Sequence, residues 1–359
     1  MYDSTVNINY KPDLNKYFHT LTHSLTHSLT HREREIEYNT STMTPMPPSF
    51  LSGNAPNATL HTLNFQHTTP PIPAYKDHFA AIIDNFLTPT ECTQLLNLAE
   101  KSTTDTETNA NPHWNRAMLN TGNNTQTLST DTRNCSRIIW DTPIIATCLL
   151  TRLRPFLEQC GIDTVRNRPF VTGPGPTKRR ETYRVSRLNE RLRFLRYEGG
   201  EFFRRHFDGS YVTGDGKERS LFTVHLYLNG DGVQDLGELE ERIEEVEKGD
   251  GLFGGDEEEL GVSIGGSDSE SGSEDGSGQE KVESSRSENE ATGDRLLGGA
   301  TSFFDGYESK DAVRVFPKAG SVLIFQQRNL VHGGDDVFRG VKYTMRTDVM
   351  YEKVCDDNE

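Results

Sequence analysis

The segment from Ser220 to Asn229, SLFTVHLYLN, alternates between two kinds of side chain. In a β-strand, every second residue points to the same face of the sheet. The residues of one face are apolar: Phe222, Val224, Leu226 and Leu228. The residues of the other face have hydrogen-bonding groups: Thr223, His225 and Tyr227. This pattern predicts a strand that packs one face on a core and lines a polar cavity with the other.

Helix signals dominate the chain between about residues 88 and 161. The apolar run from Phe79 to Phe86 predicts a strand, and Thr88-Pro-Thr-Glu91 has the N-cap, the N1 proline and the N3 glutamate of a helix start. A second helix is expected over 143–161, with Gly161 at its end.

Strand signals dominate the chain from about residue 180 onward. The residues 312–327 read as a hairpin with Pro317–Gly320 as its turn, and 341–352 reads as another strand. One face of that last strand holds four polar residues: Lys342, Thr344, Arg346 and Asp348. Helices followed by many short strands predict a mainly β fold, a β-sandwich or jelly roll with supporting helices, rather than a parallel α/β sheet.

Two segments have the composition of disordered chain. Residues 1–75 are rich in Thr, Ser, Asn, Pro and His and lack sustained apolar periodicity. Residues 231–297 hold 22 acidic and 5 basic residues, a net charge of −17, whereas the whole chain has −16, so the remainder has +1. We therefore expect one domain over 76–359 that contains a disordered acidic insert at 231–297, with one short helix near 238–248. Replacing 233–296 by a short linker should then preserve the fold.

The five cysteines are scattered and odd in number, which fits reduced thiols better than a disulfide framework. The N-terminus lacks an apolar signal segment, and no run of residues reaches transmembrane length. These features predict a cytoplasmic or nuclear protein with no membrane partner.

The stretch FFRRHFDGSY, residues 202–211, places His206 and Asp208 two residues apart on a strand, so both side chains can reach one ion. Beyond residue 78 the sequence has four histidines, and His332 follows an apolar strand and precedes a Gly/Asp loop. Two histidines and one carboxylate are the ligands of non-haem Fe(II) sites with open positions. The alternative from the residues alone is that His206 and Asp208 are solvated rim residues beside Arg204 and Arg205.

The wider pattern resembles the 2-oxoglutarate/Fe(II)-dependent dioxygenases of the prolyl 4-hydroxylase type. The resemblance runs over roughly 79–352. It rests on IIDNFLTPTEC, RLNERLRFLRYEGGEFFRRHFDGSY, RSLFTVHLYLN, GGATSFF and FPKAGSVLIFQQRNLVHGG, and on GVKYTMRTDVMY, in which Lys342 follows His332 by ten positions. It implies a double-stranded β-helix (jelly roll) core with helices N-terminal to it.

The resemblance also implies the cofactors and their ligands. His206, Asp208 and His332 would bind Fe(II) and form the catalytic centre. Lys342 would pair with the distal carboxylate of 2-oxoglutarate, with Tyr227 and, less closely matched, Tyr197 beside it. O2 would be the second co-substrate, and ascorbate would be expected to rescue over-oxidised iron.

Arg346 is a rival to Lys342 as the co-substrate anchor, because some related dioxygenases use an arginine slightly further along the strand. The two residues lie on one face, about 13 Å apart at ~3.3 Å per residue. We favour Lys342 from its spacing to His332 and expect Arg346 to pair with Asp348 or with an acid at the rim.

The implied activity is hydroxylation of a C–H bond, with release of succinate and CO2, on a prolyl or other side chain of a protein or peptide. One alternative is a nucleic-acid or small-molecule oxidative demethylase or hydroxylase, since the basic run KRRETYRVSRLNERLRFLRY could contact phosphates. Against nucleic acid, many of those arginines could pair with local acids. A second alternative is a non-catalytic interaction module that uses the acidic insert, which could bind a basic partner.

Overall fold

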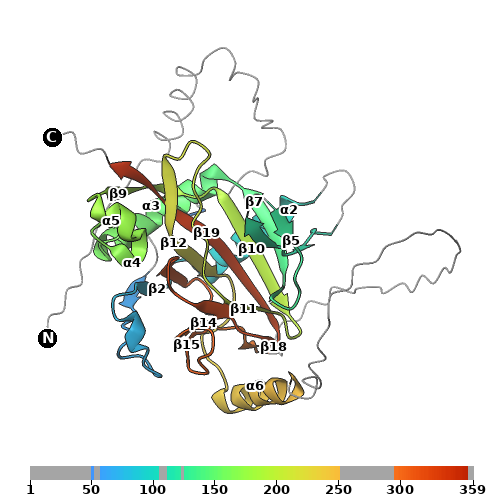
Figure 1. Cartoon of the computed structure of the whole chain (residues 1–359). Helices are drawn as coiled ribbons and strands as arrows, with labels where there is room; N and C mark the ends of the chain where they lie inside the picture. The colour runs from blue at the N-terminus through green and yellow to red at the C-terminus, as the bar shows by residue number, and fades with distance from the viewer. Residues whose placement is uncertain (1–49, 52–56, 105–110, 123–124, 251–294, 355–359) are drawn as a thin grey trace, which may run out of the picture.

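The computed structural model describes residues 50–51, 57–104, 111–122, 125–250 and 295–354 (Figure 1). The helices within these ranges are η2 (Pro73–Tyr75), α2 (Pro89–Lys101), α3 (Pro143–Gln159), α4 (Pro169–Thr172), α5 (Pro174–Lys178) and α6 (Leu236–Asp250). The six N-terminal strands are β1 (Thr59–Thr62), β2 (Ala80–Asp84), β3 (Asn115–Arg116), β4 (Leu119–Gly122), β5 (Thr125–Thr127) and β6 (Arg133–Asn134). Three more strands precede the central part of the fold: β7 (Ser136–Asp141), β8 (Thr164–Arg166) and β9 (Thr182–Leu188).

Eight strands form two facing antiparallel sheets. The major sheet contains β16 (Val322–Gln326), β12 (Glu218–Tyr227), β19 (Val341–Val354) and β10 (Arg191–Glu198) in that spatial order. The minor sheet contains β15 (Ala312–Val315), β14 (Thr301–Phe304), β17 (His332–Gly334) and β11 (Phe202–His206) in that order. Strands β1, β2, β7 and β3 extend the major sheet, β8 and β9 join it beside β19, and β6 extends the minor sheet. Two short strands, β13 (Leu297–Gly298) and β18 (Val337–Arg339), pair with each other, as do β4 and β5.

The chain switches between the two sheets as it passes through these eight strands. It enters β10 of the major sheet, β11 of the minor, β12 of the major, β14 and β15 of the minor, β16 of the major, β17 of the minor and β19 of the major. This connectivity is a double-stranded β-helix, so the predicted mainly β fold with a jelly-roll core and helices N-terminal to it is confirmed.

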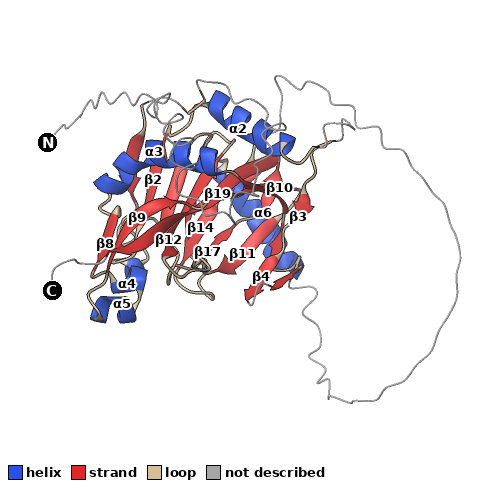
Figure 2. Ribbon diagram, turned by 90° about the horizontal axis from the view of Figure 1, so that it is seen from above, coloured by secondary structure: helices blue, strands red, loops and turns tan. Residues whose placement is uncertain are grey.

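Helices α2 and α3 cover the outer face of the major sheet (Figure 2). The apolar face of SLFTVHLYLN packs there, because Phe222, Val224 and Leu226 belong to the same buried cluster as residues of both helices. The predicted helix start is confirmed: Thr88 accepts a hydrogen bond from the Glu91 backbone, and the Glu91 side chain accepts one from the Thr88 backbone. The second helix also forms as expected.

The inner face of the major sheet looks toward the minor sheet. Tyr227, Leu323 and Phe325 pack there against Phe303 and Val313 of the minor sheet. The polar face of β12 and the polar face of β19 therefore share the space between the sheets, because Tyr227 pairs with Thr344 in the strand register.

The predicted hairpin over 312–327 is wrong. Strand β15 pairs with β14 in the minor sheet, whereas β16 pairs with β12 and β2 in the major sheet. Gly320 lies in the connection at a positive φ of 78°, and a Cβ there would lie 1.9 Å from the Leu87 carbonyl oxygen. The backbone of Gly320 instead hydrogen-bonds Tyr227 and Leu87, which directs the chain to the major sheet.

The expected disorder of residues 1–75 does not extend over 57–75. Strand β1 pairs with β2, and Phe65 and Ile72 are each 1% exposed. The few apolar residues of this polar segment are thus buried on the edge of the sandwich. Residues 1–49 and 52–56 lie outside the described residues.

The acidic segment is structured at both ends. Helix α6 spans Leu236–Asp250 and lies beside the minor sheet (Figure 1). Leu239 is 4% exposed, and Glu238 binds Arg339 through two hydrogen bonds. The short helix near 238–248 is confirmed, but the expected disorder does not hold for 231–250. Residues 251–294 lie outside the described ranges.

Two further expectations concern membrane spans and the state of the cysteines. No helix in the described ranges is long and apolar enough to cross a membrane. Four cysteines fall in those ranges, and all four are free thiols: Cys92, Cys135, Cys148 and Cys160. Cys355 lies outside the described residues.

Candidate metal centre

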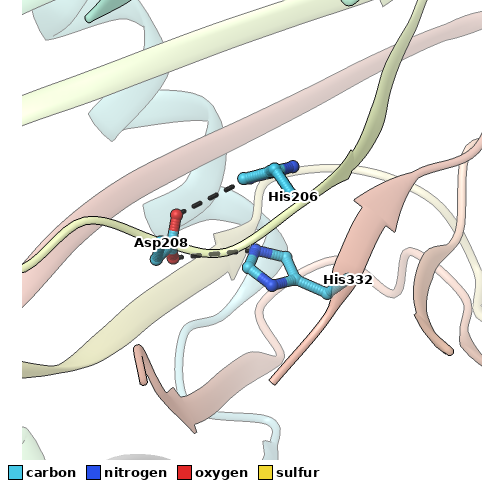
Figure 3. A group of neighbouring side chains, drawn as sticks. All are labelled: His206, Asp208 and His332. Atoms are coloured by element: carbon cyan, nitrogen blue, oxygen red, sulfur yellow. Dashed lines mark ion pairs between the residues drawn. The ribbon is translucent and has the colours of Figure 1, made fainter. Parts of the chain in front are cut away.

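His206 and His332 are cross-strand neighbours in the minor sheet. Strands β11 and β17 pair with His206 directly opposite His332, and the two ring centroids are 4.4 Å apart. Asp208 follows β11 by two residues and turns its carboxylate toward both rings (Figure 3). Oδ1 of Asp208 lies 3.6 Å from Nε2 of His206, and Oδ2 lies 3.7 Å from Nε2 of His332. The three ligand atoms lie within 4.8 Å of one another, so the three predicted metal residues meet at one point.

The contacts of both imidazole rings aim Nε2 at this point. Nδ1 of His206 lies 2.8 Å from the Arg204 carbonyl, and Nδ1 of His332 lies 3.0 Å from the Leu330 carbonyl. A carbonyl accepts a hydrogen bond only from a protonated Nδ1, so the lone pair of each neutral ring is on Nε2. Burial lowers the pKa of His332 to about 4, which keeps that ring neutral at physiological pH. This is the protonation state that a histidine metal ligand requires.

The Asp208 carboxylate is almost completely buried and is held at both oxygens. Thr223 donates to Oδ2 at 2.6 Å, and Nη2 of Arg346 lies 3.0 Å from Oδ1. Burial alone would raise the pKa of Asp208, but the charge of Arg346 and the interactions with His332 and His206 outweigh it and hold the pKa well below its usual range. Asp208 is therefore an anion at physiological pH.

Arg346 also contacts Asp348, as expected, with Nη2 3.4 Å from Oδ1. Asp348 is in turn bound by Arg193 at 3.2 Å and by the amide of Gln327 at 3.0 Å. Charges of alternating sign thus run from Arg193 through Asp348 and Arg346 to Asp208. The contact between Arg346 and the candidate metal ligand could not be foreseen from the sequence, because Asp208 is 138 positions away in the chain.

Lys342 lies deeper between the sheets and is 2% exposed. Its Nζ is 5.0 Å from the ring centroid of Tyr197 and 6.0 Å from that of Tyr227. No hydrogen bond or ion pair to this ammonium is found among the described residues, although Asp335 is close enough to act on it electrostatically. Burial lowers the pKa of Lys342 to about 8. A buried cation without an ion-pair partner is energetically costly, and a bound anion would offset that cost.

The two tyrosines lie beside Lys342, but their roles in co-substrate binding stay predictions. Tyr197 is directly opposite Lys342 in the strand register. The hydroxyl of Tyr227 donates to Oγ1 of Thr301 at 2.7 Å, so in this arrangement its proton is already used. The sequence analysis did not single out Thr301, which is the first residue of β14 in the minor sheet.

Further polar atoms line the same space without partners. His225 lies opposite Arg346, and Thr344 lies opposite Tyr227. Nε2 of His225, Oγ1 of Thr344 and Nε of Arg346 are buried and have no hydrogen-bond partner among the described residues. Burial and the charges of Lys342 and Arg346 hold the pKa of His225 well below its usual range, so the ring is neutral. The alternation of β12 and β19 in the sequence correctly placed these side chains on the inner face of the major sheet.

The basic run before the site is largely neutralised by local acids, as expected. Each of five arginines in it pairs with a carboxylate: Arg179, Arg187, Arg191, Arg193 and Arg196. Of the other histidines, His113 is exposed and hydrogen-bonds Asn115 away from the site.

The donor set fits a divalent transition metal. Two neutral imidazole nitrogens and one carboxylate on a single face are typical of non-haem Fe(II) sites, in which three positions stay open for other ligands. The hydrogen bonds from Nδ1 to carbonyl groups are the outer contacts that metal-binding histidines usually make.

Comparison with known proteins gives structural likenesses only. No family model matches the chain, and no curated protein sequence matches it. A viral collagen prolyl hydroxylase from Paramecium bursaria Chlorella virus-1 is 16% identical over 76% of this chain and 96% of that chain, with a TM-score of 0.34. A prolyl-4-hydroxylase from Pseudomonas putida is 15% identical over 77% of this chain and 94% of that chain, with a TM-score of 0.38.

A prolyl hydroxylase from Trichoplax adhaerens, solved with a peptide of hypoxia inducible factor, is 14% identical. That match covers 76% of this chain and 83% of that chain, with a TM-score of 0.38. Such low identities and TM-scores establish neither the chemistry nor the substrate of this chain.

Proposed function

We propose that this protein is an Fe(II)- and 2-oxoglutarate-dependent dioxygenase that hydroxylates a C–H bond and releases succinate and CO2. The observation that supports it best is the coincidence of two features between the two sheets. His206, Asp208 and His332 converge within 4.8 Å, and the buried ammonium of Lys342 lies on the same inner face without an ion-pair partner among the described residues. A metal centre near a buried cation suits an anion that chelates a metal at one end.

Each protein group has a defined task in this proposal. The metal, when bound by His206, Asp208 and His332, would supply the redox chemistry with O2. Thr223 and Arg346 hold the Asp208 carboxylate in place, and the two backbone carbonyls hold the histidine rings. Lys342 binds the distal carboxylate of 2-oxoglutarate through a charge-assisted hydrogen bond, and Tyr197 packs beside it.

We propose a prolyl or other side chain of a protein or peptide as the substrate. The centre lies near the molecular surface, since the side chain of His206 is 20% exposed and Phe207, between the two ligands, is 46% exposed. A long polypeptide could therefore present one residue to the metal without entering a closed pocket. The pairing of the arginines in 179–196 gives no support to nucleic acid. Ascorbate is expected to maintain the iron in its ferrous state.

The first test measures metal content and 2-oxoglutarate turnover in His206→Ala, Asp208→Ala and His332→Ala. Purified wild-type protein, loaded anaerobically with Fe(II), should release succinate slowly without substrate and faster with proline-containing peptides. Each variant should lose bound iron and succinate release while keeping its circular dichroism spectrum. The matched control is His113→Ala, which removes an exposed histidine remote from the site.

Undiminished turnover in His332→Ala would show that the three residues do not form the metal centre. Single-stranded nucleic acid belongs in the same assay. Faster succinate release with nucleic acid, but not with peptides, would contradict the peptide substrate and support the demethylase alternative.

A further inference from the structure

Arg346 contacts the candidate metal ligand with only part of its guanidinium. The same nitrogen, Nη2, lies 3.0 Å from Asp208 and 3.4 Å from Asp348. The Nε atom is buried and has no hydrogen-bond partner among the described residues. A guanidinium has five N–H donors in a fixed plane, so a group that contacts Asp208 and Asp348 through Nη2 still has donors for a further anion.

A neighbour of Arg346 also has a buried nitrogen without a hydrogen-bond partner among the described residues. His225 lies directly opposite Arg346 on the neighbouring strand, and its Nε2 is also buried without a partner. Buried polar atoms are nearly always hydrogen-bonded in folded proteins. The Nε–H of Arg346, and Nε2 of His225 in the tautomer that carries its proton there, are therefore free to donate to a ligand with oxygen acceptors.

Lys342 cannot serve the same ligand atoms as Arg346. The two residues are four positions apart on β19, about 13 Å at ~3.3 Å per residue. Arg346 is close to the metal ligands, whereas Lys342 lies against Tyr197 and Tyr227. The two cations thus make different direct contacts between the sheets, so each can bind its own carboxylate.

We propose that Arg346 binds the carboxylate at the metal-chelating end of the 2-oxo acid while it remains paired with Asp208, and that Lys342 binds the far carboxylate. The inference rests on the proposed function, and it goes beyond it by assigning each end of the co-substrate its own cation. The chain would then bind the carboxylate next to the keto group and the distal carboxylate through two different side chains.

Two probes separate the two ends: 2-oxoglutarate has both carboxylates, and 2-oxobutyrate lacks the distal one. Their dissociation constants are measured by titration calorimetry on protein saturated with Mn²⁺, which avoids turnover. Arg346→Gln should weaken binding of both probes by about tenfold, as expected for the loss of one charge-assisted contact. Lys342→Met should weaken 2-oxoglutarate by a similar factor and leave 2-oxobutyrate unchanged.

Arg346 also holds Asp208, so its effect on the metal must be measured separately. Mn²⁺ affinity is therefore determined for each variant without a 2-oxo acid. Arg346→Lys is the second variant, since an ammonium can keep the pair with Asp208 but lacks the planar fork that serves two anions. It should retain the melting temperature of the wild type and still bind both probes more weakly. Arg191→Gln, on an exposed arginine that pairs with Asp141, is the matched control.

Unchanged binding of both probes by Mn²⁺-saturated Arg346→Gln and Arg346→Lys would overturn the assignment and leave Arg346 as a support for Asp208 alone. A loss confined to 2-oxoglutarate would also overturn it, because Arg346 would then serve the distal end. Failure of the wild-type protein to bind either probe with Mn²⁺ would overturn the proposed function itself.

Discussion

Lys342 is a cation that destabilises the fold in the absence of a ligand. Its pKa falls from the ordinary 10.5 to about 8 because the ammonium is buried. This difference corresponds to a cost on the order of 3 kcal/mol while the side chain is charged. Pairing with a bound anion would offset the free-energy cost of burying this ammonium.

Lys342→Met should therefore stabilise the ligand-free protein by a few kcal/mol at pH 7. Below pH 8 lysine is charged in both the folded and the unfolded chain, so the full penalty applies. Between about pH 8 and 10.5 the unfolded chain binds more protons at this position, so the wild type gains stability as the pH rises. Urea unfolding at pH 7 and pH 9.5 should show a smaller difference between wild type and variant at the higher pH. An equal difference at both values would mean that burial does not lower the pKa of Lys342.

The same residue should make co-substrate binding depend on pH. A neutral amine cannot pair with a carboxylate, so the affinity of Mn²⁺-loaded wild type for 2-oxoglutarate should fall as the pH rises through about 8. Binding of 2-oxobutyrate, which has no distal carboxylate, should change much less over the same range. Parallel pH profiles for the two compounds would place Lys342 outside the binding site.

Helix α6 shows how a strongly acidic element attaches to a folded body. Leu239 is buried, and Ile243 and Val246 line a cavity of about 250 Å³ together with Phe304 and Phe338. These apolar residues at i, i+4 and i+7 form one helical face, and the acidic residues occupy the rest. The helix is thus held by its narrow apolar face and by the Glu238–Arg339 pair.

Leu239→Asp should detach α6 without affecting the metal centre. A charge at this buried position loses its hydration, which makes docking of the helix unfavourable. Trypsin should then cleave at Arg242 and Lys248 faster than in the wild type, while Mn²⁺ affinity stays the same. Glu240→Ala, at an exposed position of the same helix, is the control. A loss of Mn²⁺ binding in Leu239→Asp would instead show that α6 supports the site.

At the scale of the whole molecule, most of the net charge lies apart from the described fold. Residues 251–294 hold 13 acidic and 2 basic residues, which accounts for −11 of the total charge of −16. A replacement must still bridge α6 and Arg295. The 15 residues of α6 span about 22 Å at ~1.5 Å per residue, and 12 linker residues can reach about 40 Å when extended.

Replacing 251–294 by a 12-residue Gly/Ser linker should preserve the melting temperature to within about 2 °C, because the entropy of loop closure changes only logarithmically with length. Iron binding and succinate release should also be retained. Replacing 233–296 should destabilise the protein, since it removes Leu239 and the hydrogen bonds between Gln234 and the backbone of Leu296 and Gly298. Equal stability of the two deletion variants would contradict the docking of α6.

The sequence by itself determined the features that depend on near neighbours in the chain. Alternation along 220–229 and 341–352 placed Thr223, His225, Lys342 and Arg346 on the inner face, because the period of a strand is fixed by its backbone. The Thr88–Glu91 capping box could also be predicted from the sequence, since its partners are three residues apart. The convergence of His206 and Asp208 with the distant His332 was expected from the family resemblance and not from local pattern.

Only the tertiary structure decided which groups meet across the sandwich. The pairing of Arg346 with Asp208, the engagement of the Tyr227 hydroxyl by Thr301, and the transfer of the chain from β15 to β16 all join residues whose sequence contexts are unrelated. A strand that alternates correctly can pair with any compatible neighbour, and a buried cation can face any anion that the fold brings to it. Long-range packing makes those choices, so local pattern located the side chains of the site while the assembled sheets set their partners and their charges.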